Sequence, residues 1–277
     1  MSKGDIMYKL FISDVDDTLL DHNKQFSQNF DVFLKTLQDH NILFTIATGR
    51  SGQAIQPIID QLQLKLPYAT SNGAAIMQEG KVIESFMIKI GPLKAVINQA
   101  QEMGITVIYA INGQEYALSE SPFIRQARKQ NFTQQIIRPF TEKDWKTLKV
   151  DKILLVDDDP TTGLERLLSL SQQLDTVYDY LTFSDWAMDI IGSNVNKGRA
   201  LAWIADYLNI SIDETIAAGD NHNDIALLRA AGKGIAVQNA LNEAKEAADI
   251  IAKQKYGEGV IEEVHNLIKQ EKRTTIF

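Results

Sequence analysis

The fold is decided by the stretch Ser13-Asp14-Val15-Asp16-Asp17-Thr18-Leu19-Leu20, which follows directly on the apolar run KLFIS at residues 9–13. A short apolar run that ends in polar residues is typical of a strand buried in a parallel sheet. In open parallel sheets the functional site lies beyond the carboxyl ends of the strands. The carboxylates of this stretch are therefore the first candidates for chemistry.

Strands and helices alternate outward from this stretch. We expect a helix around 26–39, the strand ILFTIA, a helix around 53–63 and, after Gly192, helices over 197–208, 224–231 and 240–247 that alternate with the strands TIAAG, GIAV and DIIA. Such alternation is typical of βαβ units. We predict an α/β protein with a doubly wound parallel sheet, whose sequence is split into two pieces.

The region between these two pieces has a different pattern. Helices are expected near 93–101, 122–129 and 163–174, and strands at TVIYA, EYAL, KILLV, TVYDYL and AMDII. These strands come in adjacent pairs, which is typical of an α+β arrangement. We therefore predict a core domain made of residues 1–84 and 192–277, and an inserted α+β cap domain at residues 85–191, both of ordinary domain size.

Composition narrows the classes of function. The chain has 277 residues, with 28 basic and 36 acidic side chains and a net charge of −8, and it has no cysteine. The charge disfavours nucleic acid and anionic membranes as partners. The absence of cysteine excludes disulfides, thiolate zinc sites and cysteine nucleophiles. The N-terminal residues lack the apolar segment of a signal peptide and no apolar run is long enough to span a membrane, so we expect a cytoplasmic protein.

Polar clusters follow three of the expected strands. Asp14 and Asp16 follow the first, Thr48, Gly49 and Arg50 follow ILFTIA, and Asp220, Asn221, Asn223 and Asp224 follow TIAAG, while Lys197 opens the helix after GSNVN. Any one cluster alone is consistent with ordinary turns and helix caps. Several carboxylates at equivalent strand ends repel one another, a cost tolerated mainly where a cation or a catalytic proton is needed.

The donor atoms of these clusters point to a hard metal ion. Without cysteine or paired histidines the donors are oxygens, and oxygen donors favour Mg²⁺ over zinc. We expect the ligands to be Asp14, Asp220 and the backbone carbonyl of Asp16. Mg²⁺ pairs readily with phosphate oxygens, which makes phosphoryl transfer the first reaction class to test.

The motifs resemble those of a known superfamily. DVDDT is similar to the DxDxT nucleophile motif of the haloacid dehalogenase-like (HAD) superfamily, and Thr48, Lys197 and GDNHND stand where its second, third and fourth motifs fall. The stretches SNGA, VNKG, GIAVQNA, ADI and YGEGV resemble the Cof-type sugar-phosphatase branch, in which an α/β cap lies between the second and third motifs. Only the interval between Thr48 and Lys197 has room for such a cap. The resemblance implies a HAD-like, Rossmannoid core.

The resemblance also implies roles for individual residues. Asp14 would attack phosphorus to form an aspartyl phosphate, and Asp16 would act as general acid and then general base. The phosphate cradle would comprise Thr48, the amides of Val15 and Gly49, Lys197 and Asn223, and Mg²⁺ would be held by Asp14, Asp16 and Asp220 with Asn221 or Asp224. Asp17 stands where the family most often has glycine, so we expect a positive φ there, which aspartate tolerates better than most residues.

Four further residues are weaker candidates. Arg50 would either touch phosphate or pair with a carboxylate. Tyr109, Asp185 and Trp186 lie near strand ends of the insert and are candidates for reading the substrate, although such residues are usually core or rim. His222, inside the fourth motif, is more often a wall or capping residue than a catalyst.

The expected function is that of a Mg²⁺-dependent phosphatase acting on a small phosphate monoester, such as a sugar phosphate or a similar metabolite. Two alternatives stay open. A phosphomutase would keep the phosphoryl group, and a non-turnover phospho-acceptor module would only receive it on Asp14. The substrate and the oligomeric state do not follow from the sequence.

Overall fold

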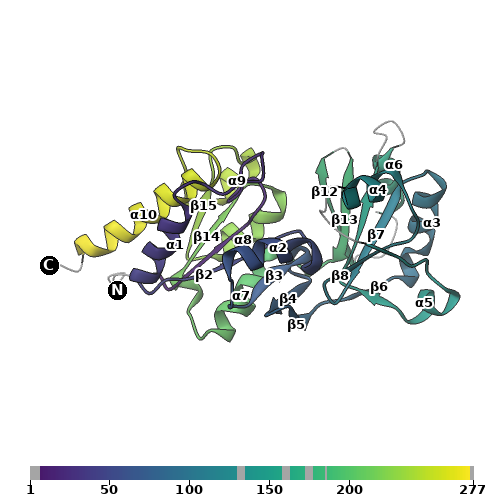
Figure 1. Ribbon diagram of the computed structural model, residues 1–277, viewed down its shortest axis with the longest axis horizontal. Helices are drawn as coiled ribbons and strands as arrows, with labels where there is room; N and C mark the ends of the chain where they lie inside the picture. The colour runs from purple at the N-terminus through teal and green to yellow at the C-terminus, as the bar shows by residue number, and fades with distance from the viewer. Residues whose placement is uncertain (1–6, 130–134, 158–162, 172–176, 185, 275–277) are drawn as a thin grey trace. The chain divides into compact units, whose positions relative to one another are not determined.

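The computed structural model of the chain describes residues 7–129, 135–157, 163–171, 177–184 and 186–274. Internal contacts divide the chain into two compact units. The first unit combines residues 1–48, 65–69 and 196–277, and the second combines 49–64 and 70–195. This division assigns residues 49–64 and 70–84 to the second unit, while the domain boundaries expected at 84/85 and 191/192 stay a prediction. Figure 1 shows the elements of each unit.

A five-stranded sheet forms the centre of the first unit, in the order β16-β15-β14-β1-β2. All of its neighbouring strands pair in parallel. The strands are β1 (Leu10–Ser13), β2 (Leu43–Ile46), β14 (Thr215–Gly219), β15 (Lys233–Ala236) and β16 (Ile250–Ile251). A parallel bridge from Ala47 to Ala69 links β2 to the start of β3 (Tyr68–Thr70), whose last residue belongs to the second unit. The carboxyl ends of β1 and β14 lie side by side, because Ser13 pairs with Ala218.

Helices cover both faces of this sheet (Figure 1). They are α1 (Phe30–Asp39), α7 (Lys197–Tyr207), α8 (Ile225–Ala230), α9 (Asn242–Ala247) and α10 (Tyr256–Thr274), with short 3₁₀ turns at Ile212–Glu214 and His222–Asp224. α1 packs against α10, and α7 packs against α8. The core between them is apolar, and Phe11 of β1 meets Phe33 of α1 edge to face.

The first helix begins later than the sequence predicts. It was expected from residue 26, but α1 begins at Phe30. Phe26 instead bridges Leu20, and the Ser27 hydroxyl accepts the N–H of Asn29 in a local turn. Such side-chain turns compete with helix formation. The long helix α10, which begins with the motif YGEGV, was not expected from the sequence.

The second unit is built on a six-stranded sheet in the order β12-β13-β11-β7-β8-β9, antiparallel except for the parallel β8–β9 pair. Its strands are β7 (Thr106–Ile111), β8 (Gln114–Ala117), β9 (Ile136–Ile137), β11 (Lys152–Val156), β12 (Tyr178–Ser184) and β13 (Ala187–Gly192). The helices α3 (Lys94–Glu102) and α6 (Leu164–Ser171) pack against each other over an apolar cluster that includes Ile97, Leu155 and Met188. The paired strands of the insert therefore form the expected α+β unit.

Smaller elements complete the second unit. They are α2 (Gly52–Leu62), the antiparallel hairpin of β4 (Ala75–Gln78) and β5 (Lys81–Ser85), the antiparallel pair of β6 (Ile88–Lys89) and β10 (Lys149–Val150), α4 (Pro122–Lys129), α5 (Glu142–Thr147) and 3₁₀ turns at Ser71–Gly73 and Gly91–Leu93. The last of these turns leads directly into α3, so α3 begins one residue later than expected.

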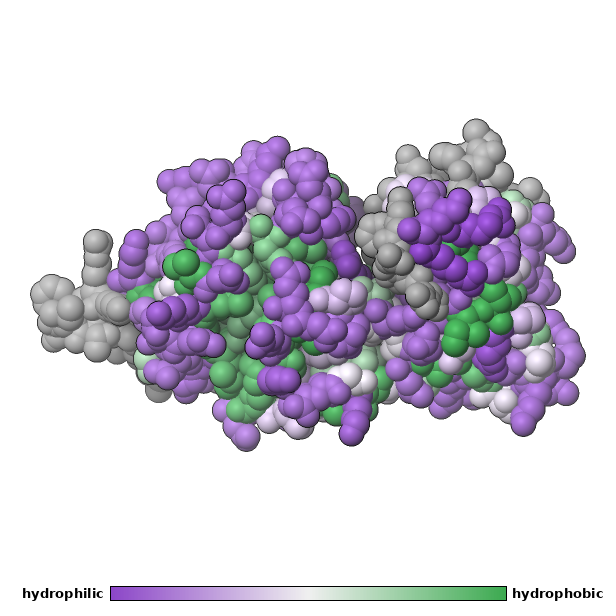
Figure 2. All heavy atoms as spheres, in the orientation of Figure 1, coloured by the Kyte–Doolittle hydropathy of each residue, from purple (hydrophilic) through white to green (hydrophobic). Residues whose placement is uncertain are grey.

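The prediction of an α/β fold with a doubly wound parallel sheet and an α+β insert is confirmed. On the face drawn in Figure 2 hydrophilic residues cover most of the surface, with apolar residues in separate groups. Exposed large apolar side chains, such as Val32, Ile83 and Ile136, come from different elements. Among the described helices, none has the length and apolar character needed to span a bilayer.

Candidate active site

The first unit places Asp14 at the end of the buried strand β1. The Asp14 N–H donates to the carbonyl of Ala218 at 2.9 Å, which extends the parallel ladder by one residue, and the whole residue is only 5% exposed. The chain then turns, because the N–H groups of Leu19 and Leu20 both donate to the carbonyl of Val15. Asp17 lies inside this turn with φ +59°, as expected for the position where the family most often has glycine.

Lys197 reaches Asp14 from the start of α7. The Asn196 side chain caps this helix by accepting the N–H of Arg199 at 2.8 Å. Gly198 allows the close packing of α7 on α8, since a Cβ at this position would collide with the carbonyl oxygen of Ala226. The Lys197 ammonium, fully buried, then donates to Asp14 Oδ1 at 2.5 Å and to Asp224 Oδ1 at 2.6 Å.

The loop after β14 supplies two further buried carboxylates. Asp220 Oδ1 accepts a hydrogen bond from the Thr18 hydroxyl at 2.7 Å. Asp224 Oδ2 accepts the N–H groups of Asp220 and Asn221, each at 3.0 Å. Asp224 thereby holds Lys197 with one oxygen and the loop with the other. The Thr18 hydroxyl, to which the sequence analysis gave no role, ties the loop after β1 to the loop after β14.

The charges of this group are unbalanced. Asp14, Asp220 and Asp224 offer oxygens that all lie within 4.8 Å of one another, against the single ammonium of Lys197. Burial, reinforced by the charge of Asp224, raises the pKa of Asp220 to about 7. Burial also raises the pKa of Asp14, which the charge of Lys197 only partly offsets. Burial would lower the pKa of Lys197, but the charges of Asp14 and Asp224 outweigh it and keep the lysine protonated.

These residues fit a bound Mg²⁺ ion. The donors are buried carboxylate oxygens, which Mg²⁺ prefers. A cation among them would relieve the repulsion that adds to burial in raising the pKa of Asp14 and of Asp220. Of the predicted ligands, the structure brings Asp14, Asp220 and Asp224 together, and Asn221 caps the turn beside them by accepting the N–H of His222 at 2.7 Å.

Asp16 lies on the same turn as Asp14 but has another neighbour. Its Oδ1 forms a salt bridge with Lys24 Nζ at 3.1 Å, and both side chains are partly exposed. The turn itself is held by Asn239, whose side chain donates to the carbonyl of Asp17 at 2.8 Å and accepts the N–H of Tyr256 at 2.9 Å. Asn239 belongs to the motif GIAVQNA and Tyr256 opens YGEGV, so these two motifs support the loop that carries Asp14 and Asp16.

The remaining core candidates are distributed over both units. Thr48 is the last residue of the first unit's segment 1–48; it is fully buried, and its N–H donates to the carbonyl of Ala69 at 3.0 Å. Asn223 is half-buried in the 3₁₀ turn before α8. Gly49 and Arg50 belong to the second unit, where the carbonyl of Arg50 accepts the N–H of Ser71 at 2.7 Å.

The candidate substrate readers have three different placements. Tyr109 is buried in the core of the second unit; its ring stacks on Tyr116, and its hydroxyl donates to the carbonyl of Arg138 at 2.8 Å. This burial favours the core reading for Tyr109. Trp186 is 47% exposed at the turn between β12 and β13. Asp185 lies outside the described residues.

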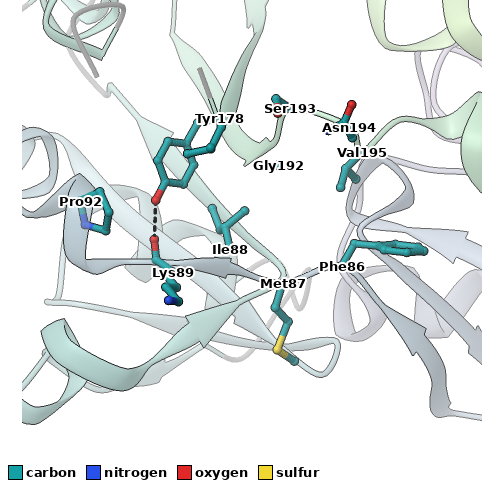
Figure 3. A pocket seen from close by; sticks show the side chains of 11 residues that line it. Phe86, Met87, Ile88, Lys89, Pro92, Tyr178, Gly192, Ser193, Asn194 and Val195 are labelled. Atoms are coloured by element: carbon teal, nitrogen blue, oxygen red, sulfur yellow. Dashed lines mark hydrogen bonds between the residues drawn. The ribbon is translucent and has the colours of Figure 1, made fainter. Parts of the chain in front are cut away.

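The second unit also contains a hollow of about 490 Å³. Figure 3 shows Phe86, Met87, Ile88 and Pro92 on one side and Tyr178 with the segment 192–195 on the other, with the Tyr178 hydroxyl bonded to the carbonyl of Lys89. The lining is mainly apolar. It includes residues next to Ser85 and Ile191, where the sequence predicts the two ends of the insert.

The parallel sheet, with buried carboxylates at its strand ends, defines an α/β protein whose carboxylate oxygens lie close enough together to share one metal ion. Comparison with known proteins identifies the family of this chain. The family model described as haloacid dehalogenase-like hydrolase matches residues 11–264. The chain therefore belongs to the haloacid dehalogenase-like hydrolases and is a Cof-type hydrolase, as its motifs indicated.

Individual relatives match nearly the whole chain. The 5-amino-6-(5-phospho-D-ribitylamino)uracil phosphatase YcsE of Bacillus subtilis is 22% identical over 269 residues, 97% of this chain and 99% of that protein. MG265 of Mycoplasma genitalium, which is named provisionally as a phosphatase, is 28% identical over 88% of this chain and 92% of its own length. The crystal structure of TM0651 from Thermotoga maritima superimposes with a TM-score of 0.76 at 26% identity, covering 93% of this chain and 97% of that chain.

Proposed function

We propose that this protein is a Mg²⁺-dependent phosphatase that hydrolyses a small phosphate monoester through a covalent aspartyl phosphate on Asp14. The observation that carries the proposal is the buried contact of the Asp14 carboxylate with Lys197, at the end of β1, beside Asp220 and Asp224. The two relatives named above as phosphatases support the reaction class.

The chain's own residues account for both half-reactions. An oxygen of Asp14 forms a bond to phosphorus while the bond from phosphorus to the leaving alcohol breaks, and Asp16 gives the departing oxygen its proton. Asp16 then takes a proton from water as that water attacks phosphorus, which releases inorganic phosphate and restores Asp14. The aspartyl phosphate divides one difficult displacement into two easier ones.

Both half-reactions need positive charge close to the phosphoryl oxygens. Lys197 supplies one fixed charge beside Asp14, and Asp224 orients its ammonium with a hydrogen bond of 2.6 Å. Asp14, Asp220 and the backbone carbonyl of Asp16, with Asn221 or Asp224, would hold Mg²⁺, which would neutralise phosphoryl oxygens when bound. Thr48, Asn223 and the amides of Val15 and Gly49 complete the proposed phosphate cradle.

The proposed substrate is a phosphorylated sugar, sugar alcohol or similar metabolite. The name of the Bacillus subtilis relative describes a phosphorylated ribityl compound, which belongs to this chemical class. The insert, and within it the exposed Trp186 together with Asp185, would read the leaving group, and Arg50 would contact phosphate. Tyr109 joins this group only if its buried ring becomes accessible.

Turnover of p-nitrophenyl phosphate with Mg²⁺ tests the proposal. We expect many turnovers per molecule, loss of activity with a chelator and recovery on adding Mg²⁺. A stoichiometric burst of p-nitrophenol without further turnover would identify a phospho-acceptor module instead. Transfer of the phosphoryl group to a second sugar hydroxyl, with no release of inorganic phosphate, would identify a phosphomutase.

A panel of phosphorylated metabolites then defines the substrate class. We expect sugar and sugar-alcohol phosphates to give the highest kcat/KM values. An Asp14→Asn variant purified in the same way serves as the control for contaminating phosphatases. Equal activity in that variant would contradict the assignment of Asp14.

A further inference from the structure

A second buried lysine lies in the second unit. Lys152 opens β11, and its side chain is only 7% exposed. Its ammonium donates to both oxygens of Asp189, each at 2.9 Å, and to the carbonyl oxygen of Gly49 at 2.8 Å. Gly49 directly follows Thr48 in the second motif. Lys152 therefore connects the sheet of the second unit to Gly49, which takes part in the proposed phosphate cradle. We call Gly49 and the residues that follow it, up to Gln53, the phosphate-binding segment.

The carboxylate that neutralises Lys152 is itself fixed. Asp189, on β13 beside β11, is fully buried, and its Oδ2 also accepts a hydrogen bond from the Asn72 side chain at 2.8 Å. Asn72, of the SNGA motif, has φ +58°, a conformation that asparagine tolerates better than most residues. Lys152, Asp189 and Asn72 form one buried network, which we call the Lys152 network.

Stability alone is a weak reason for such a network. Removing both charges of an ion pair from water costs about as much as their attraction returns, so apolar residues of similar volume often stabilise a core as well or better. A buried ion pair does, however, hold a backbone group at a fixed point. Here that group is the carbonyl of Gly49.

The neighbouring residues are held at further points. The Ser51 hydroxyl donates to Glu115 Oε1 at 2.8 Å, and the N–H of Gln53 donates to the carbonyl of Gly113 at 2.8 Å. Glu115 and Gly113 belong to the strand pair β7–β8 and its turn. The segment from Gly49 to Gln53 is thus held at Gly49, Ser51 and Gln53 by the sheet of the second unit and its β7–β8 turn.

Peptide geometry links this anchor to catalysis. All peptide bonds of the described residues are trans. In a planar trans peptide the C=O of Gly49 and the N–H of Arg50 point in opposite directions. Fixing the carbonyl therefore fixes the direction of the next amide and limits rotation about Gly49, a residue without a side chain to restrain it.

We propose that Lys152 is a positioning residue. Its ammonium is neutralised by Asp189 and donates a hydrogen bond to the Gly49 carbonyl, which holds the phosphate-binding segment in its productive conformation. This inference rests on the proposed function, in which Gly49 takes part in the phosphate cradle. Because all substrates share the phosphate, the positioning contributes equally to every one of them. A misplacement of about 1 Å at such a segment reduces rates by up to about 100-fold.

The test uses the double variant Lys152→Met/Asp189→Asn in the full chain with Mg²⁺. Methionine keeps most of the lysine volume, and asparagine still accepts the Asn72 hydrogen bond, so no buried charge is left unpaired. We expect kcat/KM to fall about 10- to 100-fold, by the same factor for p-nitrophenyl phosphate and for each sugar phosphate. The affinity for inorganic phosphate, measured by titration calorimetry, should fall in parallel.

Tyr178→Phe is the matched control. It removes a different hydrogen bond from a buried side chain to a backbone carbonyl of the same unit, that of Lys89 at 2.9 Å. We expect this variant to keep kcat/KM and phosphate affinity within about twofold of the parent protein, even if its melting temperature falls.

Three results would overturn the inference. They are unchanged kcat/KM and phosphate affinity in the folded double variant, losses that differ between substrates, which would make Lys152 a reader of the leaving group, and equal losses in Tyr178→Phe. If the double variant does not fold, Asn72→Gly replaces it, since glycine accepts the positive φ. A smaller but still uniform loss is then expected, and no loss would reject the proposal.

Failure of the proposed function gives a different result. A parent protein that lacks turnover would reject the phosphatase assignment. The calorimetric comparison of phosphate affinity needs no turnover, so it still tests the positioning role of Lys152. A parent protein that also fails to bind phosphate would reject both proposals.

Discussion

Among the described residues, one buried lysine in each unit contacts aspartate, but the two groups differ in charge balance. Lys197 donates to Asp14 and Asp224, and Asp220 lies beside them, so three carboxylates share one ammonium. Lys152 donates to Asp189 and to the uncharged carbonyl of Gly49, so one carboxylate meets one ammonium. The first group has an excess of negative charge, which the proposed Mg²⁺ would neutralise, whereas the second group is balanced.

From this difference we assign the chemistry to the group around Lys197 and a positioning role to the group around Lys152. Burial, reinforced by the neighbouring carboxylates, raises the pKa of Asp14 and Asp220, and the proposed metal ion would offset this cost. A balanced pair instead holds backbone in place. The comparison predicts that equivalent substitutions have opposite effects in the two groups.

The largest effect is expected from one substitution made in both groups. Asp14→Asn removes the nucleophile and should lower kcat by about 10⁴-fold or more, while the melting temperature stays equal or rises because one repelling charge is gone. Asp189→Asn leaves the charge of Lys152 buried and unpaired, and should cost about 3–5 kcal/mol of stability. Its kcat per folded molecule should fall by no more than about 100-fold.

Steady-state kinetics and thermal unfolding of both variants check this contrast. A stable but fully inactive Asp189→Asn protein would transfer the chemistry to the second unit. Near-normal hydrolysis by Asp14→Asn would show that the chemistry does not depend on Asp14 of the first unit.

Asp16→Asn is expected to have the next largest effect. Without a proton donor, hydrolysis of alkyl phosphates should slow by about 10²- to 10⁴-fold. Hydrolysis of p-nitrophenyl phosphate should slow much less, because its leaving group needs no proton. Measuring kcat for both substrate types checks the role, and equal losses on both would argue against Asp16 as the acid.

Metal binding should depend on pH in the direction set by Asp220. Its pKa in the folded chain without metal is about 7, above the ordinary value of 3.8, so its stabilising contribution is full below about pH 4 and is lost as the pH rises through 7. Mg²⁺ binds the ionised carboxylates. We therefore expect Mg²⁺ to raise the melting temperature by several degrees at about pH 8 and by much less at about pH 5.5.

Asp220→Asn is the control for this measurement, and its Mg²⁺-induced shift should be small at both pH values. An equal shift at both pH values in the parent protein, or a full shift in Asp220→Asn, would place the ion elsewhere.

The smallest expected effect concerns substrate choice in the second unit. Trp186→Ala removes an exposed ring and should change the ratio of kcat/KM values between two sugar phosphates by about 10-fold, without changing their dependence on Asp14. Tyr109→Phe removes only a hydroxyl from a buried ring and should leave the ratio unchanged while it lowers stability by about 1 kcal/mol. Unchanged ratios in Trp186→Ala would exclude that residue as a reader.

The sequence predicts the first unit better than the second for a physical reason. Strand ends of a parallel sheet meet at one edge, so Asp14 and Asp220 could be placed together from their positions after KLFIS and TIAAG. The positive φ of Asp17 followed from the resemblance, because the family most often has glycine at this position, and it is confirmed. The roles assigned to these residues stay predictions.

Contacts that depend on side-chain direction across an antiparallel sheet could not be predicted in this way. Lys152 is the first residue of KILLV and Asp189 is the middle residue of AMDII, and neither stretch indicates that the two strands are neighbours. Tyr109 lies near a strand end in the sequence, yet its ring turns into the core against Tyr116. Lys24 belongs to none of the motifs, and the motif GIAVQNA, which contains Asn239, does not by itself indicate a contact with the loop of Asp17.

Trapping the covalent intermediate tests the central claim most directly. Protein mixed with substrate and Mg²⁺, then quenched into borohydride, would have any aspartyl phosphate reduced to homoserine, which peptide mass spectrometry locates. The account predicts homoserine at position 14, dependent on both substrate and Mg²⁺, and its absence from Asp14→Asn. Homoserine at another aspartate, or steady turnover with none at position 14, would contradict it.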